Sequence, residues 1–412
     1  MKGTKKLQPE NYVIATIITY AVLPLSGFAT DVYLPSFPTM ATELGVAEHN
    51  IQFTLSLYLI SFGLSQIFTG ILLDVYGRYK ISLAALFLFS VSCIVTAVAT
   101  DIGIIYMMRI VQGICTAFTV VVCRAFFSDI YEGEKKKHYL SLMTIVWSAG
   151  PIIAPFVGGY LEHIFGWRSN FYFLAVYSLI LFILQLIFLG ETVKTRIQMH
   201  ISAIGESYRT LLTAKDFVFG IALLGVSYAM IMLFSLSAPF IIEHRMGYSP
   251  IVMGYVALVM GLAWMCGGFI SKSLIGKNFL IKVQSAFAAQ VLLIVLMIVT
   301  SYIVSNIFTI VILAFLIHIT AGFIFNNFFT YCLARFPKIA GTAGGVTGGL
   351  AYSLTSILSY GAVAAIKPVS QLTMGTGYSL IAVVGIIALL LSRKIYLTNE
   401  PSHPQVTSKV MR

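Results

Sequence analysis

The stretch GFATDVYLPSFP, residues Gly27–Pro38, closes the first long apolar run of the chain. Asp31 lies near the far end of that run, where burying a carboxylate in hydrocarbon costs roughly 2.5–3.5 kcal/mol. Pro35 and Pro38 follow directly, and proline bends or ends a helix because it lacks the amide hydrogen. Two interpretations are open: Asp31 has a function inside the membrane, or it lies among the lipid headgroups just past the span.

The composition of the whole chain is that of a multi-pass membrane protein. Of its 412 residues, 58% are hydrophobic and 10% are charged, and the mean hydropathy is +0.92. Apolar runs of about 20 residues, the length of a membrane-spanning helix, recur almost end to end. They are too long for barrel strands, and a helix pairs its own backbone groups. We therefore expect an all-α membrane protein with twelve transmembrane helices, at residues 12–37, 50–73, 79–99, 102–127, 138–162, 169–190, 217–242, 250–275, 280–303, 306–333, 340–366 and 372–394.

The distribution of positive charge predicts the orientation of these spans. Cytoplasmic loops carry an excess of Lys and Arg. With the N-terminus inside, the inner segments hold 22 of the 26 Lys and Arg residues, among them the group from Arg124 to Lys137. Both termini are therefore expected in the cytoplasm, in a bacterial inner membrane. The formal charge of +11 is spread one loop at a time, so it does not indicate a nucleic-acid partner.

One inner connection is longer than the others and divides the spans into six and six. We expect an N-terminal half at 1–190, a cytoplasmic linker at 191–216, a C-terminal half at 217–397 and a disordered cytoplasmic tail at 398–412. The linker mixes basic and apolar residues, which suits an amphipathic helix on the inner membrane surface. A solvated linker accounts for the same composition.

The loop between spans 2 and 3 carries a spaced set of glycines and charges. It reads GILLDVYGRYK, with Gly70, Asp74, Gly77 and Arg78, and Gly77 permits the tight turn. This segment resembles motif A of the major facilitator superfamily, G-x-L-x-D-x-x-G-R. The resemblance implies two six-helix halves around a central cavity, and an Asp–Arg latch that holds the outward-open state. Val75 stands where the family often has a basic residue, so the latch is expected to be weaker.

Span 4 contains an arginine well inside an apolar run. Arg109 lies eight residues after Asp101, roughly 12 Å at the helical rise, which is far for a side chain to reach the outer surface. We therefore expect it to face a polar cavity. With Gln112 and Gly113 it resembles motif B of the same superfamily, R-x-x-Q-G, in which the Arg is implicated in proton coupling.

Span 5 combines prolines and glycines that would destabilise a helix in water. In a membrane they allow a kink and close approach to a neighbouring helix, and packing alone explains them. The segment resembles motif C, the antiporter motif of drug exporters, although Ala154 replaces a frequent glycine. The residues that carry this resemblance are Gly150, Pro151, Pro155, Gly158 and Gly159.

The opening stretch belongs with these motifs. Its residues Thr30–Pro38 resemble the TDxYLPxxP signature of the Bcr/CflA group of drug:proton antiporters, the bicyclomycin and chloramphenicol exporters. The resemblance is close in the N-terminal half and is limited to span number and spacing in the C-terminal half. It favours Asp31 as the proton carrier, paired with Arg109 at a similar depth. If span 1 ends before Asp31, the site is instead a gate at the outer rim of the cavity.

Polar and aromatic residues inside spans are candidates for the wall of a substrate cavity. They are Tyr33, Tyr58, Gln66, Gln112, Trp147, Tyr228, Trp264, His318, Asn326 and Asn327. Most aromatic residues in apolar helices only pack, and His318 is either a proton-transfer group or a hydrogen-bonded packing residue. The glycines of 341–349 lack the lysine and strand of a phosphate loop, so we interpret them as helix-packing residues.

The chain lacks the motifs of enzymes that hydrolyse ATP or esters, and its five cysteines show no metal-ligand spacing. We therefore expect that the protein is not an enzyme and needs no cofactor or metal. We expect a monomer whose partners are a small-molecule substrate, protons and the lipid bilayer. The first hypothesis is proton-coupled efflux of a small amphipathic molecule by alternating access. The second is uptake of a nutrient, or of a metal chelate such as a siderophore, by proton symport. The third is a membrane sensor that transports nothing.

Overall fold

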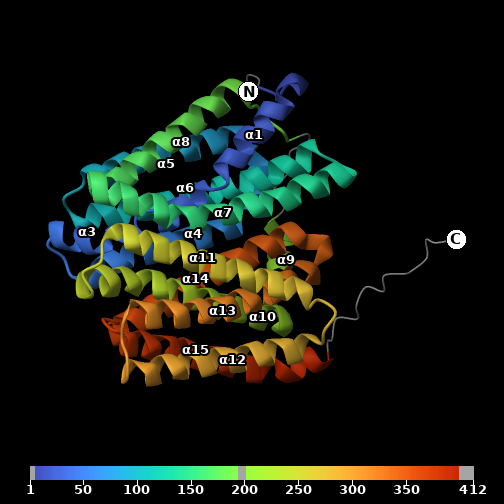
Figure 1. Ribbon diagram of the computed structural model, residues 1–412. Coiled ribbons are helices and arrows are strands. Elements are labelled where there is room, and N and C mark those ends of the chain that lie inside the picture. Colours follow the sequence, from blue (N-terminus) through green and yellow to red (C-terminus); the bar gives the residue numbers. More distant parts are fainter. Residues whose placement is uncertain (1–4, 194–200, 399–412) are drawn as a thin grey trace.

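The structure is a computed structural model that describes residues 5–193 and 201–398 (Figure 1). Within these residues, twelve helical segments are long and apolar enough to cross a membrane, as predicted. Apart from one isolated bridge between Lys6 and Glu191, the regular elements in the described part are helices. The predicted all-α architecture is confirmed.

The first membrane segment, Pro9–Glu43, is a broken helix. It consists of η1 (Pro9–Asn11), α1 (Tyr12–Val22), α2 (Leu25–Asp31), η2 (Leu34–Ser36) and α3 (Phe37–Glu43). Pro24 and Pro35 lie at the starts of α2 and η2. The predicted end at residue 37 is too early, because Pro38 occupies the first turn of α3, where proline is tolerated. Asp31 therefore lies inside the segment and not at its end.

The other membrane segments are longer uninterrupted helices. Before the linker they are α4 (Glu48–Tyr76), α5 (Tyr79–Val98), α6 (Ile102–Ile130), α7 (Gly133–Phe165) and α8 (Arg168–Phe188). After the linker they are α10 (Lys215–Pro239) with its π-helical extension η3 (Phe240–Arg245), α11 (Pro250–Ser273), α12 (Phe279–Ser301), α13 (Ile307–Arg335) with the short η4 (Pro337–Ile339) after it, α14 (Ala340–Ile366) and α15 (Gln371–Thr398).

The described part of the predicted linker contains one helix, α9 (Ile201–Thr213). Its Leu211 is fully buried, and the hydroxyl of Tyr208 donates to the carbonyl of Ile67 in α4 at 2.7 Å. The helix is therefore docked on the bundle along one side. Residues 194–200 of the linker and 399–412 of the predicted tail lie outside the described residues.

The membrane helices form two groups that meet along two helix pairs. Figure 1 shows α1–α8 on one side and α10–α15 on the other, with α4 and α7 facing α14 and α11. Small residues allow these contacts: a Cβ on Gly63 would lie 2.6 Å from the carbonyl oxygen of Gly349, and one on Gly254 would lie 2.9 Å from that of Pro155. Close backbone approach through glycine is how membrane helices gain packing energy.

The two groups are also joined at the end of the bundle away from the α4–α5 loop. The Gln52 side chain of α4 donates to the carbonyl of Leu236 in α10 at 2.7 Å. The Ser356 hydroxyl of α14 donates to the carbonyl of Ser56 in α4 at 3.1 Å. These bonds bridge the groups near the start of α4 and hold that end together.

Candidate functional site

A buried arginine forms the centre of the first group of helices. Arg109 of α6 is 0% exposed. Its Nη2 donates to the carbonyl of Ala29 at 2.9 Å, and its Nη1 donates to Oε1 of Gln112 at 2.7 Å. The guanidinium also lies over the rings of Tyr33 and Tyr58, 4.4 and 4.5 Å from their centroids. These partners allow a charge to remain inside the membrane segment.

Asp31 lies beside this centre at the end of α2. Its side chain is 4% exposed, and its Oδ2 has no hydrogen-bond partner in the described structure. Asp31 is close enough to Arg109 for the two charges to attract each other, but Arg109 donates to the backbone of Ala29 and not to the carboxylate. The predicted pairing of Asp31 with Arg109 is therefore indirect, through the attraction of the two charges and not through a hydrogen bond between the two side chains. A buried carboxylate with an unsatisfied oxygen is a group that gains from binding a proton.

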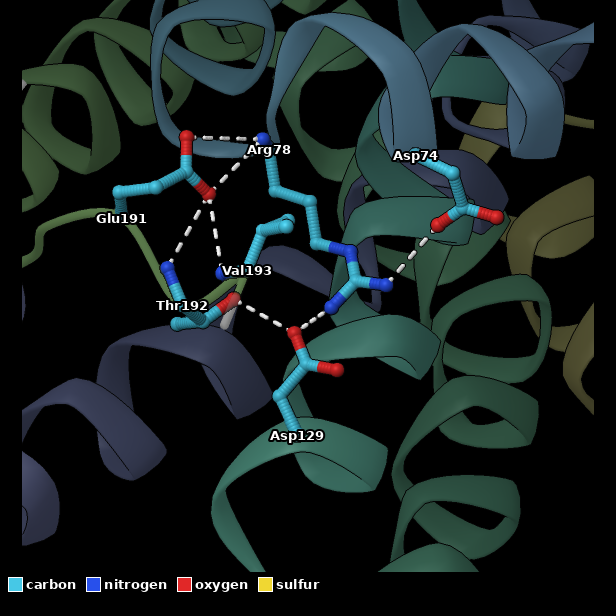
Figure 2. A network of polar contacts seen from close by, with 6 residues as sticks. All are labelled: Asp74, Arg78, Asp129, Glu191, Thr192 and Val193. Carbon is cyan, nitrogen blue, oxygen red and sulfur yellow. Dashed lines mark hydrogen bonds and ion pairs between the residues drawn. The ribbon is translucent and has the colours of Figure 1, made fainter. Parts of the chain in front are cut away.

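The loop between α4 and α5 holds the second polar cluster, shown in Figure 2. Gly77 has a φ of 95°, a conformation that favours glycine and turns the chain directly into α5. Arg78 forms ion pairs with Asp74, at 3.1 Å, and with Asp129 at the end of α6. Gly70 has open space at its Cβ position, so packing does not demand glycine there.

The segment after α8 completes this cluster of Asp74, Arg78, Asp129, Glu191 and Thr192, which we call the latch cluster after the latch predicted from motif A. Both carboxylate oxygens of Glu191 accept from the backbone N–H of Arg78, at 3.1 and 3.2 Å, and Oε1 also accepts from the amides of Thr192 and Val193 (Figure 2). The Thr192 hydroxyl donates to Asp129 at 2.7 Å. Sequence reasoning missed Asp129 and Glu191. The sequence feature that could have identified them is their position: each is an acidic residue at the inner end of a span, on the same side of the membrane as the loop with Arg78.

The prolines and glycines of α7 lie against two other segments. Pro151 and Pro155 lie within the continuous helix. A Cβ on Gly150 would lie 2.9 Å from the carbonyl oxygen of Pro24, and one on Gly159 would lie 2.6 Å from that of Pro250 in α11. The glycines therefore permit contact with the first segment on one side and with the second helix group on the other.

Gly158 makes the tightest of these contacts. A Cβ at this position would overlap the carbonyl oxygen of Val32 and lie 2.7 Å from its carbonyl carbon. Val32 follows Asp31 directly in the chain. The motif-C resemblance and the signature around Asp31 thus come from two segments that touch.

A cavity of about 780 Å³ lies between the two helix groups and reaches the latch cluster. Of the ten predicted cavity residues, Gln66, Trp147 and Tyr228 line it. Gly70, Asp74 and Arg78 line its latch end. The volume lies within the roughly 300–1,000 Å³ typical of pockets for small organic ligands.

The other seven predicted cavity residues lie elsewhere. Tyr33, Tyr58 and Gln112 surround Arg109, and Trp264 packs behind Tyr228 with ring centroids 5.8 Å apart. The remaining three have partners in the C-terminal helices: His318 with the carbonyl of Ala314, Asn326 with that of Gly322, and Asn327 with the Ser271 hydroxyl. Local hydrogen bonds thus pair the two amide side chains and one ring nitrogen of His318, whose other ring nitrogen, Nε2, is buried without a partner in the described structure.

The cavity wall and the buried centre are connected by aromatic rings. Tyr58, which covers Arg109, stacks with Phe62 at 5.9 Å between centroids, and Phe62 meets Tyr352 edge-on at 5.0 Å. Phe62 and Tyr352 both line the cavity. Arg109 is therefore separated from the cavity by a short run of side chains.

Comparisons with known proteins agree with this architecture. Residues 20–360 match the sequence profile of the Major Facilitator Superfamily. The bicyclomycin resistance protein homolog of Haemophilus influenzae is 24% identical over 83% of this chain and 87% of its own length. Multidrug resistance protein D of Escherichia coli is 24% identical over 84% of this chain and 86% of its own length.

A solved transporter structure resembles the whole helix arrangement. The crystal structure of a D-xylose–proton symporter covers 92% of this chain and 97% of its own, with a TM-score of 0.73 and 14% sequence identity. At that identity, the likeness concerns the fold alone.

Proposed function

Because the chain belongs to the major facilitator superfamily and is of its drug:proton antiporter type, we propose that it exports a small amphipathic molecule in exchange for protons. It is a transporter and not an enzyme, and it resides in the bacterial inner membrane as a multi-pass protein. In this proposal its two helix groups are six-helix halves that rock about the central cavity, with both termini in the cytoplasm. The excess of basic residues on the predicted inner segments supports that orientation.

The observation that carries the proposal is the buried Asp31 with its unpartnered oxygen beside Arg109. Proton uptake would neutralise Asp31 and weaken its attraction to the guanidinium, which binds the α2 backbone at Ala29. Release of the proton on the other side of the membrane would restore the negative charge of Asp31 and this attraction. Asp31 would thus couple protonation to the position of α2.

A second contact links α2 to the substrate cavity. Trp147 of α7 lines the cavity, and its indole N–H donates to the hydroxyl of Ser26 in α2 at 2.9 Å. A molecule that displaces Trp147 therefore acts on the same short helix that ends in Asp31. This arrangement supports competition between substrate and proton through α2.

The conformation agrees with a cavity that faces the cytoplasm. The cavity reaches the latch cluster, whereas Gln52–Leu236 and Ser356–Ser56 bonds join the two groups at the other end. The partners of Arg78 in the latch cluster lie in the first helix group or directly after its last helix, α8. We infer that the latch engages the second group only when the cavity closes at this end.

The proton gradient is a sufficient energy source. One charge moving through 100 mV supplies about 2.3 kcal/mol. That free energy supports roughly a fortyfold accumulation of a neutral substrate per proton exchanged.

The test is proton-driven flux in everted membrane vesicles with an acid interior and no ATP, using chloramphenicol and bicyclomycin as probes. We expect wild type to accumulate at least one probe and Asp31→Asn to lose the proton-dependent part. Glu10→Gln, which removes an exposed acid of η1, is the matched control and retains the flux.

Accumulation of a probe against its gradient by Asp31→Asn would exclude Asp31 as the proton carrier. Accumulation in right-side-out vesicles under an inward proton gradient would show uptake instead of efflux. Protein content and melting temperature, measured alongside, separate a loss of coupling from a loss of folding.

A further inference from the structure

Arg124 is the one charged residue of the cavity wall that has no partner within the described residues. It lies near the inner end of the predicted span at residues 102–127, and the structure places it inside α6, which continues to Ile130. Its side chain lines the cavity and is accessible from it, although the surrounding helices enclose this region. The side chain therefore projects into the open space of the cavity. No hydrogen bond or ion pair to it is present in the described structure.

Two other charged side chains line the described cavity wall, Asp74 and Arg78, and they form an ion pair with each other. Asp129, which also pairs with Arg78, is not among the residues that line the cavity. Within the described wall, Arg124 is therefore the charged side chain that is left without an ion-pair partner. An unpaired guanidinium in a membrane protein normally marks the path of a ligand or an ion.

The surroundings of Arg124 are aromatic and small. Tyr352 of α14 is close enough for its hydroxyl to interact electrostatically with Arg124, and Tyr228 lies against Tyr352 at 5.5 Å between centroids. Gly344 of α14 lies beside the guanidinium without a side chain between them; a Cβ there would be in van der Waals contact with Nη1, at 3.7 Å. A planar apolar body can therefore lie on the rings while an acceptor group meets Arg124.

We propose that Arg124 binds an anionic group of the substrate and that the transported class is an aromatic amphiphile carrying a carboxylate or a similar anion. This inference rests on the proposed function, because the bound anion is a substrate only if the protein transports it. Arginine presents several N–H donors in a planar fork that matches a carboxylate. The same charge disfavours organic cations in this part of the cavity.

The test measures binding of three probes that share one ring system to the purified full chain by equilibrium dialysis. They are 2-naphthoate, neutral 2-naphthamide and the 2-naphthylmethylammonium cation. We expect wild type to bind naphthoate most tightly and the cation most weakly. Arg124→Gln should weaken naphthoate binding about tenfold or more and change naphthamide binding less than twofold. Arg124→Lys keeps the charge and should retain part of the preference.

Arg393→Gln removes an exposed arginine at the end of α15 and serves as the control. Equal weakening of all three probes by Arg124→Gln, or a wild-type preference for the cation, would overturn the inference. If the Gln variant does not fold, the wild-type ranking and the Lys variant still decide. Naphthoate selectivity without proton-driven flux would refute only the proposed function, and flux without selectivity would refute only this inference.

Discussion

Replacing Gly158 with alanine tests whether close contact of α7 with the first membrane segment positions Asp31. The new Cβ would overlap the carbonyl oxygen of Val32 and lie 2.7 Å from its carbonyl carbon. Carbon atoms in contact are optimally about 3.5–4.0 Å apart, so the two backbones must separate by at least about 1 Å, and by more to clear the carbonyl oxygen. Neither partner is a flexible side chain that could rotate away.

The expected cost follows from that displacement. Overpacking in a well-packed interior costs about 1–3 kcal/mol, and a clash between two backbones belongs near the upper end. Alanine recovers up to about 1 kcal/mol through its better helix propensity. We therefore expect Gly158→Ala to lose about 2 kcal/mol of stability and to displace Val32 together with its neighbour Asp31.

Gly361→Ala is the matched control, because nothing lies within 4 Å of its Cβ position in α14 and it does not line the cavity. Melting curves in one detergent should show Gly158→Ala a few degrees below wild type and Gly361→Ala at or above it. Proton-driven flux in everted vesicles should fall in the first variant only. If Gly158→Ala melts and transports like wild type, the contact with Val32 does not position Asp31.

Two further substitutions test the buried polar groups. Arg109→Lys keeps the charge but loses the fork that reaches Ala29 and Gln112 together, so we expect proton-driven flux to fall at least tenfold; unchanged flux would show that one donor is enough. Tyr378→Phe removes a buried hydroxyl that has no partner in the described structure, so we expect stability to be unchanged or up to about 1 kcal/mol higher; a drop of several degrees in melting temperature would contradict this reasoning.

Sequence reasoning found the charged residues of the latch cluster only in part. Asp74 and Arg78 are four residues apart on one turn of chain, and that spacing is visible in the sequence. Glu191, whose carboxylate binds the Arg78 amide, is 113 residues away. Nothing local in the sequence indicates which acid reaches that amide, because the answer depends on how the end of α8 meets the start of α5.

For the buried centre around Arg109, too, the sequence indicated part of the site and the tertiary structure decided the rest. Hydropathy places Arg109 well inside an apolar run and predicted that it faces a polar cavity within the membrane, whereas Asp31 lies near the end of its run and hydropathy left its depth open. The structure buries both side chains. The direction of the guanidinium, toward the carbonyl of Ala29 and between Tyr33 and Tyr58, follows from the rotation of α6 against α2 and α4. A rotation of one helix by a fraction of a turn would present different side chains.

By itself the sequence determined the all-helical architecture, the number of spans and the positions of the motifs along the chain. These properties depend on the length and apolar content of local segments, which a bilayer converts directly into helices. Only the tertiary structure decided that Asp31 lies inside a broken segment, that Gly158 touches its neighbour Val32, and that Arg124 points into the cavity. Those facts depend on helix breaks, rotation and packing between distant segments, and hydropathy carries no information about which faces meet.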